Sequence, residues 1–257
     1  MKQSPVAART VRSSDQAERS SFLKSLLSRG AVDWNMSERT ALYVVLVPIV
    51  VCFSGAATAL LGKGAYKWFV TEDGFAENLQ VLFWTLSFVF CLFVAKRAWR
   101  NNDRLVAVLY IILTFGLFFL IGEELSWGQR MFGWETPASM GEINKQNETN
   151  LHNIYGVGDT FKWITLMIGV YGTLLPLLLF FTSVFGSARA TMAWITPHFL
   201  QLTYFAPFFV WRVYRNLFDP PKGIYFVVSE YSEVMELNLA IGFFLFMLYQ
   251  LRRNLNG

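Results

Sequence analysis

The stretch that decides the fold is LVAVLYIILTFGLFFLIGEELSWGQR, residues 105–130. From Leu105 to Ile121 it is almost wholly apolar, and about 20 such residues suffice for an α-helix to cross the hydrocarbon core of a membrane. Two adjacent carboxylates, Glu123 and Glu124, follow where such a helix leaves the hydrocarbon. Ionisable groups at that depth are costly and usually mark a pathway, a ligand site or catalysis. The stretch therefore predicts a spanning helix with a candidate site at its end.

The composition extends this interpretation to the whole chain. Of its 257 residues, 54% are hydrophobic and only 16% are charged. Soluble domains carry about 25% charged residues, so too few charges are present here to coat a water-facing surface. We expect an all-α integral membrane protein in contact with membrane lipids. The formal charge of +4 is small, and the basic residues collect near the ends of apolar runs, which argues against nucleic acid as a partner.

Six segments are long and apolar enough to span a membrane. They are residues 41–61, 78–95, 104–122, 161–183, 192–211 and 231–250. We therefore predict a bundle of about six transmembrane helices over residues 41–257, with a long, partly helical loop between the third and the fourth. Residues 1–40 form a polar tail, and no cleavable signal peptide is expected because the first apolar run is long enough to span.

The tail contains a short pattern typical of a helix lying on a membrane surface. Phe22, Leu23, Leu26 and Leu27 share one helical face, basic residues surround them, and Gly30 is the expected end of the helix. The alternative is a disordered tail in which this periodicity arises by chance.

The distribution of charge predicts the orientation. With the N-terminus in the cytoplasm and loops on alternate sides, 14 of the 22 Lys and Arg lie inside, which favours cytoplasmic N- and C-termini. In the same frame 13 of the 18 Asp and Glu lie outside, so the outer face is rich in carboxylates. Cys52 and Cys91 lie in apolar runs at different depths, and we expect two free thiols rather than a disulfide.

Four acidic groups are expected to converge on that outer face. They are Glu72, Asp73 and Glu77; Glu123 and Glu124; Glu148 with His152 and Asn144; and Glu230, Glu233 and Glu236. Residues four apart on a helix share a face, which would bring Glu148, His152 and Asn144 together. The last three carboxylates span about 120° of a helix and would face an interior cavity. Asn153 follows His152 as a further supporting residue.

The loop from residue 123 to 160 is long for a compact membrane domain, and such loops are often lids or binding loops. Such a loop could fold back over the acidic groups. If the third helix continues, Ser126 and Arg130 share a face with Glu123, and Arg130 could pair with a carboxylate or grip a phosphate. His198 follows Pro197 near the inner end of the fifth segment, too far from the acidic face to take part, and is expected to be structural.

Clustered carboxylates with one imidazole allow three kinds of chemistry. Glu123, Glu124, Glu148 and His152 could ligate a divalent cation. They could instead exchange protons as general acid and base, because neighbouring carboxylates do not all ionise cheaply. The third possibility is simple pairing with the nearby basic residues Arg130, Lys145, Arg212 and Arg215. We take Glu123, Glu124, Glu148, His152 and Arg130 as the candidate catalytic set, the first four also being the candidate metal ligands.

Three motifs carry a resemblance. Glu72-Asp73-Gly74-x-x-Glu77, Gly122-Glu123-Glu124-x-Ser126-Trp127-Gly128-Gln129-Arg130 and Asn150-Leu151-His152-Asn153 resemble a group of bacterial multi-pass membrane proteins. The resemblance covers residues 72–155 and implies the bacterial inner membrane, but it implies no activity. Ceramidase-like membrane hydrolases use several His residues in a metal site, and this chain departs from that pattern because it has a single His on the relevant side.

Three functions compete at this point. The first is an enzyme at the outer boundary of the membrane, a metal-assisted hydrolase or transferase acting on a lipid or lipid-linked envelope substrate. The second is a non-enzymatic assembly subunit whose outer cap binds another envelope protein. The third is a cation or proton transporter, which is less favoured because the centres of the predicted helices are almost wholly apolar.

Overall fold

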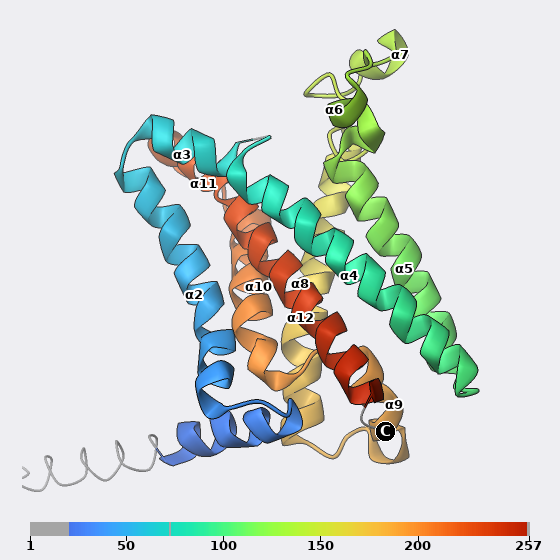
Figure 1. Ribbon diagram of the computed structural model, residues 1–257. Coiled ribbons are helices and arrows are strands. Elements are labelled where there is room, and N and C mark those ends of the chain that lie inside the picture. The colour runs from blue at the N-terminus through green and yellow to red at the C-terminus, as the bar shows by residue number, and fades with distance from the viewer. Residues whose placement is uncertain (1–20, 72, 256–257) are drawn as a thin grey trace, which may run out of the picture.

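The computed structural model describes residues 21–71 and 73–255, with the side chains of residues 159, 254 and 255 outside the description (Figure 1). A first helix covers residues 21–33. The helices that follow are α2 (Glu38–Leu60), α3 (Lys63–Val70), α4 (Phe75–Arg100), α5 (Arg104–Glu124), α6 (Gln129–Phe132), α7 (Ala138–Gly141), α8 (Val157–Phe181), α9 (Arg189–Ile195), α10 (Leu202–Leu217), α11 (Tyr225–Glu230) and α12 (Ser232–Leu255), with 3-10 turns η1 (Ser126–Gly128), η2 (Gly186–Ala188), η3 (Phe199–Gln201) and η4 (Lys222–Ile224).

Within these residues, five helical stretches are long and apolar enough to cross a membrane. They are Glu38–Leu60, Lys63–Arg100, Arg104–Glu124, Thr160–Phe181 and Lys222–Arg253. Large apolar side chains such as Tyr43, Val50 and Phe53 of α2 remain exposed on the bundle, as expected of surfaces that face lipid. The chain is thus an all-α protein with the helices of a membrane protein.

The fifth predicted segment, residues 192–211, is not one continuous helix. Helix α9 ends at Ile195, Thr196 is extended, and α10 begins only at Leu202. Pro197 disfavours helical geometry in the residue before it, which explains the break. Helix α10 alone is 16 residues long, about 24 Å at 1.5 Å per residue, and so falls short of a hydrocarbon core of about 30 Å.

His198 occupies this break and has the structural role predicted for it. Its Nδ1 accepts a hydrogen bond from the Leu200 amide at 3.3 Å and so caps the turn η3. Its Nε2 lies 3.1 Å from the Asp33 carboxylate at the end of the first helix. The break is therefore tied to the tail of the protein.

The first helix does not end at Gly30 as predicted, but continues to residue 33. A Cβ at Gly30 would lie 2.6 Å from the side chain of Leu200. The glycine is thus a close-contact position where the helix crosses η3, and Ala31, Trp34 and Leu200 pack around that crossing. Cys52 and Cys91 are free thiols, as expected.

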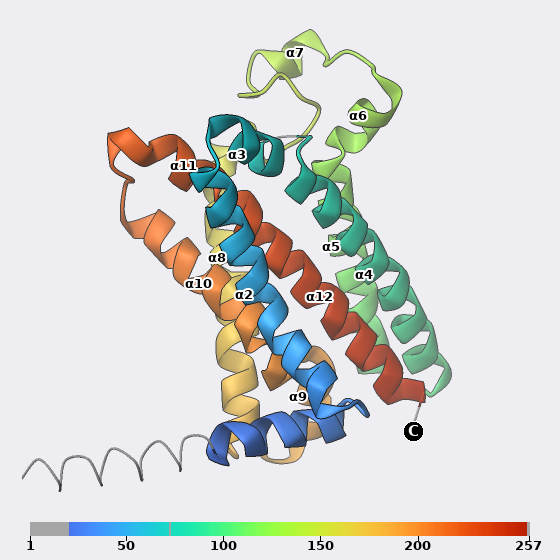
Figure 2. The same ribbon diagram turned by 60° about the vertical axis from the view of Figure 1, so that its left-hand side comes forward.

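Helix α12 runs through the middle of the bundle and packs against α4, α10 and α2 (Figures 1 and 2). Helices α4 and α5 form an antiparallel hairpin on one side of it, and α8 pairs with α10 on the other. Both ends of the described chain lie at the same end of the bundle. The opposite end carries α3, α11 and the segment 125–156, and we call it the loop end.

Candidate functional site

The helix that carries Glu123 and Glu124 ends abruptly after them. Ser126 and Trp127 adopt positive φ values of 46° and 53°, which turns the chain away from the α5 axis. This turn brings the Trp127 indole back over the last turn of α5, where its Nε1 donates to Glu123 Oε1 at 2.7 Å. The helix does not continue, so the condition under which Ser126 and Arg130 would share a helical face with Glu123 is not met.

The returning indole requires a glycine at position 122. A Cβ there would lie 2.9 Å from the Trp127 ring. We expect Gly122→Ala to lower the free energy of unfolding by about 1–3 kcal/mol, the usual cost of overpacking. Thermal unfolding in detergent measures this. Gly116→Ala, in the same helix, is the matched control, because a Cβ there meets nothing within 4 Å. Equal stability of the two variants would contradict the prediction.

Glu123 is the anchor of the loop end. Its carboxylate is buried, with 3% of the residue exposed. Besides the Trp127 bond, its Oε2 accepts the backbone amides of Leu151 at 2.8 Å and His152 at 2.9 Å, and lies 3.2 Å from His152 Nδ1. Because an ionised carboxylate only accepts, Nδ1 is the donor, and the ring is held in one tautomer. The loop thus folds back onto Glu123.

The segment around His152 is not a helix, so the prediction of one shared helical face for Asn144, Glu148 and His152 is wrong. Asn144 instead pairs with Ile154 in an isolated antiparallel bridge. The Asn144 side chain organises the turn, since its Oδ1 accepts the amides of Gln146 and Glu148 and its Nδ2 donates to Asn150.

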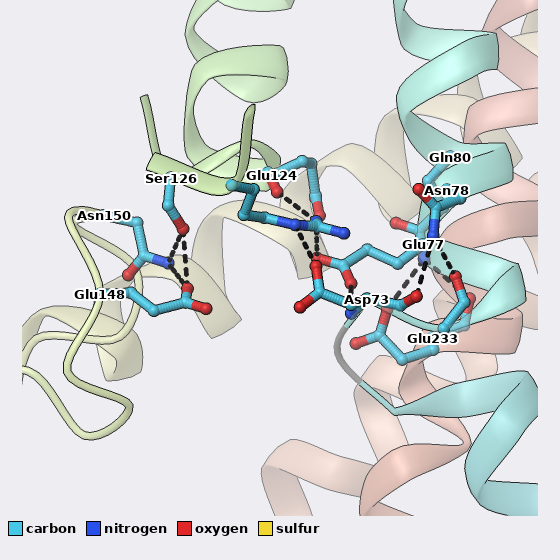
Figure 3. Close-up of polar contacts among 11 residues, drawn as sticks. Asp73, Glu77, Asn78, Gln80, Glu124, Ser126, Glu148, Asn150 and Glu233 are labelled. Atoms are coloured by element: carbon cyan, nitrogen blue, oxygen red, sulfur yellow. Dashed lines mark hydrogen bonds and ion pairs between the residues drawn. The ribbon is translucent and has the colours of Figure 1, made fainter. Parts of the chain in front are cut away.

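Glu148 lies in a small network of its own. Its Oε2 accepts from Ser126 Oγ at 2.8 Å and from Asn150 Nδ2 at 2.6 Å (Figure 3). Ser126 is buried, and the pair joins the end of α5 to the loop. Asn153, the other supporting residue of this motif, accepts the Lys145 amide with its carbonyl, and its Nδ2 is buried without a partner.

Arg130 reaches across to the start of α4. Its Nη1 donates to Glu77 Oε1 and to the Glu124 carbonyl, both at 2.7 Å, and its Nε pairs with Asp73. Glu77 also accepts the Asp73 amide at 2.5 Å, so it lies between two partners at the N-terminus of α4 (Figure 3). Arg130 is therefore used in pairing. Glu72, also predicted here, lies outside the described residues.

The three carboxylates of the last acidic group lie on two different helices. Glu230 ends α11, whereas Glu233 and Glu236 belong to α12, so the predicted wedge of three on one helix is wrong. Glu233 Oε2 accepts from Gln80 Nε2 at 2.9 Å (Figure 3), and Glu236 pairs with Arg212 of α10. Of the three, Glu236 lines a partly open cavity, whereas Glu230 and Glu233 are not among its lining residues.

That cavity has a volume of about 820 Å³ and lies between α4, α5, α8, α10 and α12. Its wall is mostly apolar, with Gln80, Glu124 and Glu236 near the loop end and the hydroxyl-bearing residues Thr160, Thr165 and Tyr171 along α8. Within the described part of the chain, the Glu124 carboxylate makes no hydrogen bond or ion pair. Phe161 of α8 also lines the cavity, and its ring packs at 6.3 Å against that of His152. His152 is therefore a neighbour of the cavity wall and does not itself line the cavity.

The surroundings of His152 set its charge. Burial alone would lower the pKa of the imidazole, but the hydrogen bond to Glu123 and the charges of Glu124, Glu123 and Glu236 outweigh burial and raise it above the ordinary 6.5. The protonated ring is thus favoured more than in a free histidine. Its Nε2 has no hydrogen-bond partner among the residues described.

The predicted metal ligands do not converge on one point. Over residues 21–71 and 73–255, no group of three or more His, Cys, Asp or Glu side chains has the arrangement of a metal site. Glu123 and Glu148 already accept hydrogen bonds from the loop and from Ser126. A cation bound by either would have to displace those donors.

Two features of the site were not predicted. Gln80 is an amide inside the apolar segment 78–95, two residues after Asn78 at its start, and a polar residue in such a segment is itself a signal that was available. Trp127 was noted only as part of the motif over residues 122–130, because nothing in the local pattern shows that it turns back onto Glu123.

Compared with protein-family models, with curated proteins and with solved structures, the chain matches none of them.

Proposed function

We propose that this protein is a membrane-embedded hydrolase or transferase that acts on a lipid or lipid-linked envelope substrate, at the loop end of the bundle and on the outer side of a bacterial inner membrane. The observation that carries the proposal is the Glu123–His152 pair, 3.2 Å apart, with the His152 ring packed against Phe161 in the wall of an apolar cavity. A carboxylate that fixes the tautomer of a histidine leaves the other ring nitrogen as a proton acceptor, the arrangement of a general base.

The chemistry follows from that geometry. His152 Nε2 takes the proton of a water molecule, or of an acceptor hydroxyl in a transferase, while the oxygen bonds to the carbonyl carbon or phosphorus of the substrate. The bond from that centre to the leaving oxygen breaks, and the leaving oxygen takes the proton back from His152. Glu123 holds the ring and stabilises the imidazolium, and Glu124 faces the head of the bound molecule.

The test is lipid conversion by purified protein in nanodiscs made from total bacterial lipid, followed by mass spectrometry. Wild type converts one lipid class with time, and His152→Gln lowers the rate by about 10²–10⁴-fold, the usual contribution of a general base. Glu142→Gln is the control, because Glu142 is an exposed carboxylate of the same loop. Conversion that survives in His152→Gln, or no conversion by wild type, contradicts the proposal.

The pH profile separates a base from a merely structural histidine. Only the neutral ring accepts a proton, so the rate rises with pH through the raised pKa of His152, above 6.5. In Glu123→Gln the hydrogen bond to a carboxylate is lost, and the midpoint moves to lower pH. A midpoint that is unchanged by Glu123→Gln would show that another group is titrating.

A divalent cation is a separate prediction. Glu124 is the carboxylate of the predicted set whose oxygens remain available in the described structure, with Glu236 also at the cavity. Elemental analysis of wild type against Glu124→Gln tests it: stoichiometric metal that is lost in the variant supports a metal-assisted reaction, and its absence from both supports the acid–base route alone.

An assembly subunit is the second candidate, favoured by the exposed apolar side chains of the loop. Met131, Phe132 and Trp134 are 66%, 73% and 44% exposed, on a segment that stands beyond the bundle (Figure 1). If this surface is the function, a Phe132→Ser, Trp134→Ser variant loses the role of the protein in cells while His152→Gln retains it. The proposed enzyme predicts the reverse.

A further inference from the structure

We infer that the cavity binds an amphiphile with an apolar chain and an amine-bearing head group, and that this is the substrate class. That the bound molecule is a substrate rests on the proposed function, whereas the binding itself is argued from the cavity. Three observations carry it: the hydrogen-bonding character of the polar end, a buried amide oxygen without a partner, and the pairing of the nearby arginines.

The polar end of the cavity presents acceptors. Glu124 contributes a carboxylate without a hydrogen bond or ion pair in the described structure. Glu236 contributes a second carboxylate, of which Oε1 pairs with Arg212. Since the Glu236–Arg212 pair is neutral in sum, Glu124 is the carboxyl group of this end whose ionised form an ammonium group would compensate. An ammonium group, with N–H donors and one positive charge, complements this end.

Gln80 provides an independent indication of a ligand. It is fully buried and lines the cavity. Its Nε2 donates to both the carbonyl and the carboxylate of Glu233, at 3.1 and 2.9 Å, which fixes the orientation of the amide because both neighbours are acceptors. Its Oε1 is then a buried acceptor with no partner. Such a group costs free energy unless a donor reaches it, and a ligand N–H is such a donor.

An anionic head group fits this end poorly. The two arginines beside the cavity are already paired, Arg130 with Asp73 and Glu77, and Arg212 with Glu236. A phosphate would meet the Glu124 carboxylate without an unpaired arginine to compensate for it. The Glu124 carboxyl group, beside arginines that are already paired, therefore selects cationic over anionic amphiphiles.

The rest of the cavity suits one chain. About 820 Å³ lies within the 300–1,000 Å³ or so of small-ligand sites, and Leu117, Ile164, Met167 and Phe246 contribute to an apolar wall. Helices α5 and α8, which form two of its sides, are not among the closely packed helix pairs. Gly116 on α5 lines the cavity, and a Cβ there meets nothing within 4 Å. A larger side chain at 116 therefore fills the cavity without a clash.

The experiment measures binding, not turnover. Full-length protein in a neutral detergent is titrated with dodecylamine, dodecanol and dodecyl phosphate, by competition with a fluorescent fatty-chain probe. We expect dodecylamine to bind about tenfold to a hundredfold more tightly than the other two, as for a hydrogen bond to a charged group. Glu124→Gln abolishes this preference, and Gly116→Leu weakens all three. Glu142→Gln and Gly64→Leu, both away from the cavity, are the controls.

Equal or tighter binding of dodecyl phosphate overturns the inference, as does an amine preference that survives Glu124→Gln, or binding that is unaffected by Gly116→Leu. These outcomes are independent of the proposed function. If wild type converts an anionic lipid, the proposed enzymatic function is supported and the amine head group is rejected. If the protein binds the amine but converts no lipid, the proposed enzymatic function is rejected and the binding site is supported.

Discussion

Replacing Arg130 with methionine is expected to lower the free energy of unfolding by about 3–5 kcal/mol, the usual cost of removing one partner of a buried ion pair. The side chains of Arg130 and Glu77 are only 14% and 11% exposed. Without the guanidinium, the Glu77 carboxylate is left buried and uncompensated, and the Glu124 carbonyl loses its donor. Thermal and denaturant unfolding in detergent measure the loss.

Two further variants make this result specific. Arg100→Met, at an exposed position, is expected to change stability by less than about 0.5 kcal/mol. The double variant Arg130→Met, Glu77→Met removes both charges, and it is expected to recover much of the loss because an apolar pair leaves no buried charge. If the double variant loses as much stability as the separate variants Arg130→Met and Glu77→Met lose together, the ion pair is not the cause.

Glu123→Gln is expected to release the loop without unfolding the bundle. The carboxylate accepts from Trp127, from two backbone amides and from His152. Bonds to a charged group contribute about 1.5–3 kcal/mol each, so losing the charge speeds exchange of the Leu151 and His152 amides by more than about tenfold. Hydrogen exchange of the peptide covering 143–155 measures this, with Glu142→Gln as the control. Unchanged protection in Glu123→Gln would show that the loop is held by other contacts.

The same bond gives the loop a pH dependence of definite sign. The pKa of His152 is raised in the folded state, so the stability that its protonation contributes is fully present below the ordinary value of 6.5 and is lost as pH rises through the raised value. Protection of the 143–155 peptide, corrected for intrinsic exchange, should fall over that range in wild type. In Glu123→Gln the fall is expected to be smaller, and an equal fall would assign the titration elsewhere.

The spanning helices could be predicted because each is a local property. An apolar run such as 104–122 has to satisfy its own backbone hydrogen bonds in lipid, so length and hydropathy suffice to place it. The same rule fails for the segment 192–211, because its apolar content does not show that the helix breaks before Pro197. The local pattern likewise predicts a helix end at Gly30, whereas the structure uses this glycine to make room for the side chain of Leu200, which is distant in sequence.

The candidate site shows where local pattern stops. Glu123 and His152 were both predicted as site residues, but the helical face predicted for Glu148 and His152 is wrong, because that part of the loop consists of a bridge and turns. Their contact spans 29 residues and depends on two left-handed residues, Ser126 and Trp127, which reverse the chain after α5. No periodicity encodes such a reversal.

The sequence by itself determined that this chain is built from membrane-spanning helices and that its carboxylates gather near helix ends, because hydropathy and charge act residue by residue. Only the tertiary structure decided which carboxylates pair with Arg130 and Arg212 or accept the loop amides, and which carboxylate faces the cavity without such a partner. That distinction depends on distances between α4, α5, α8 and α12, and such distances are set by packing between helices, not by the order of residues within any one of them.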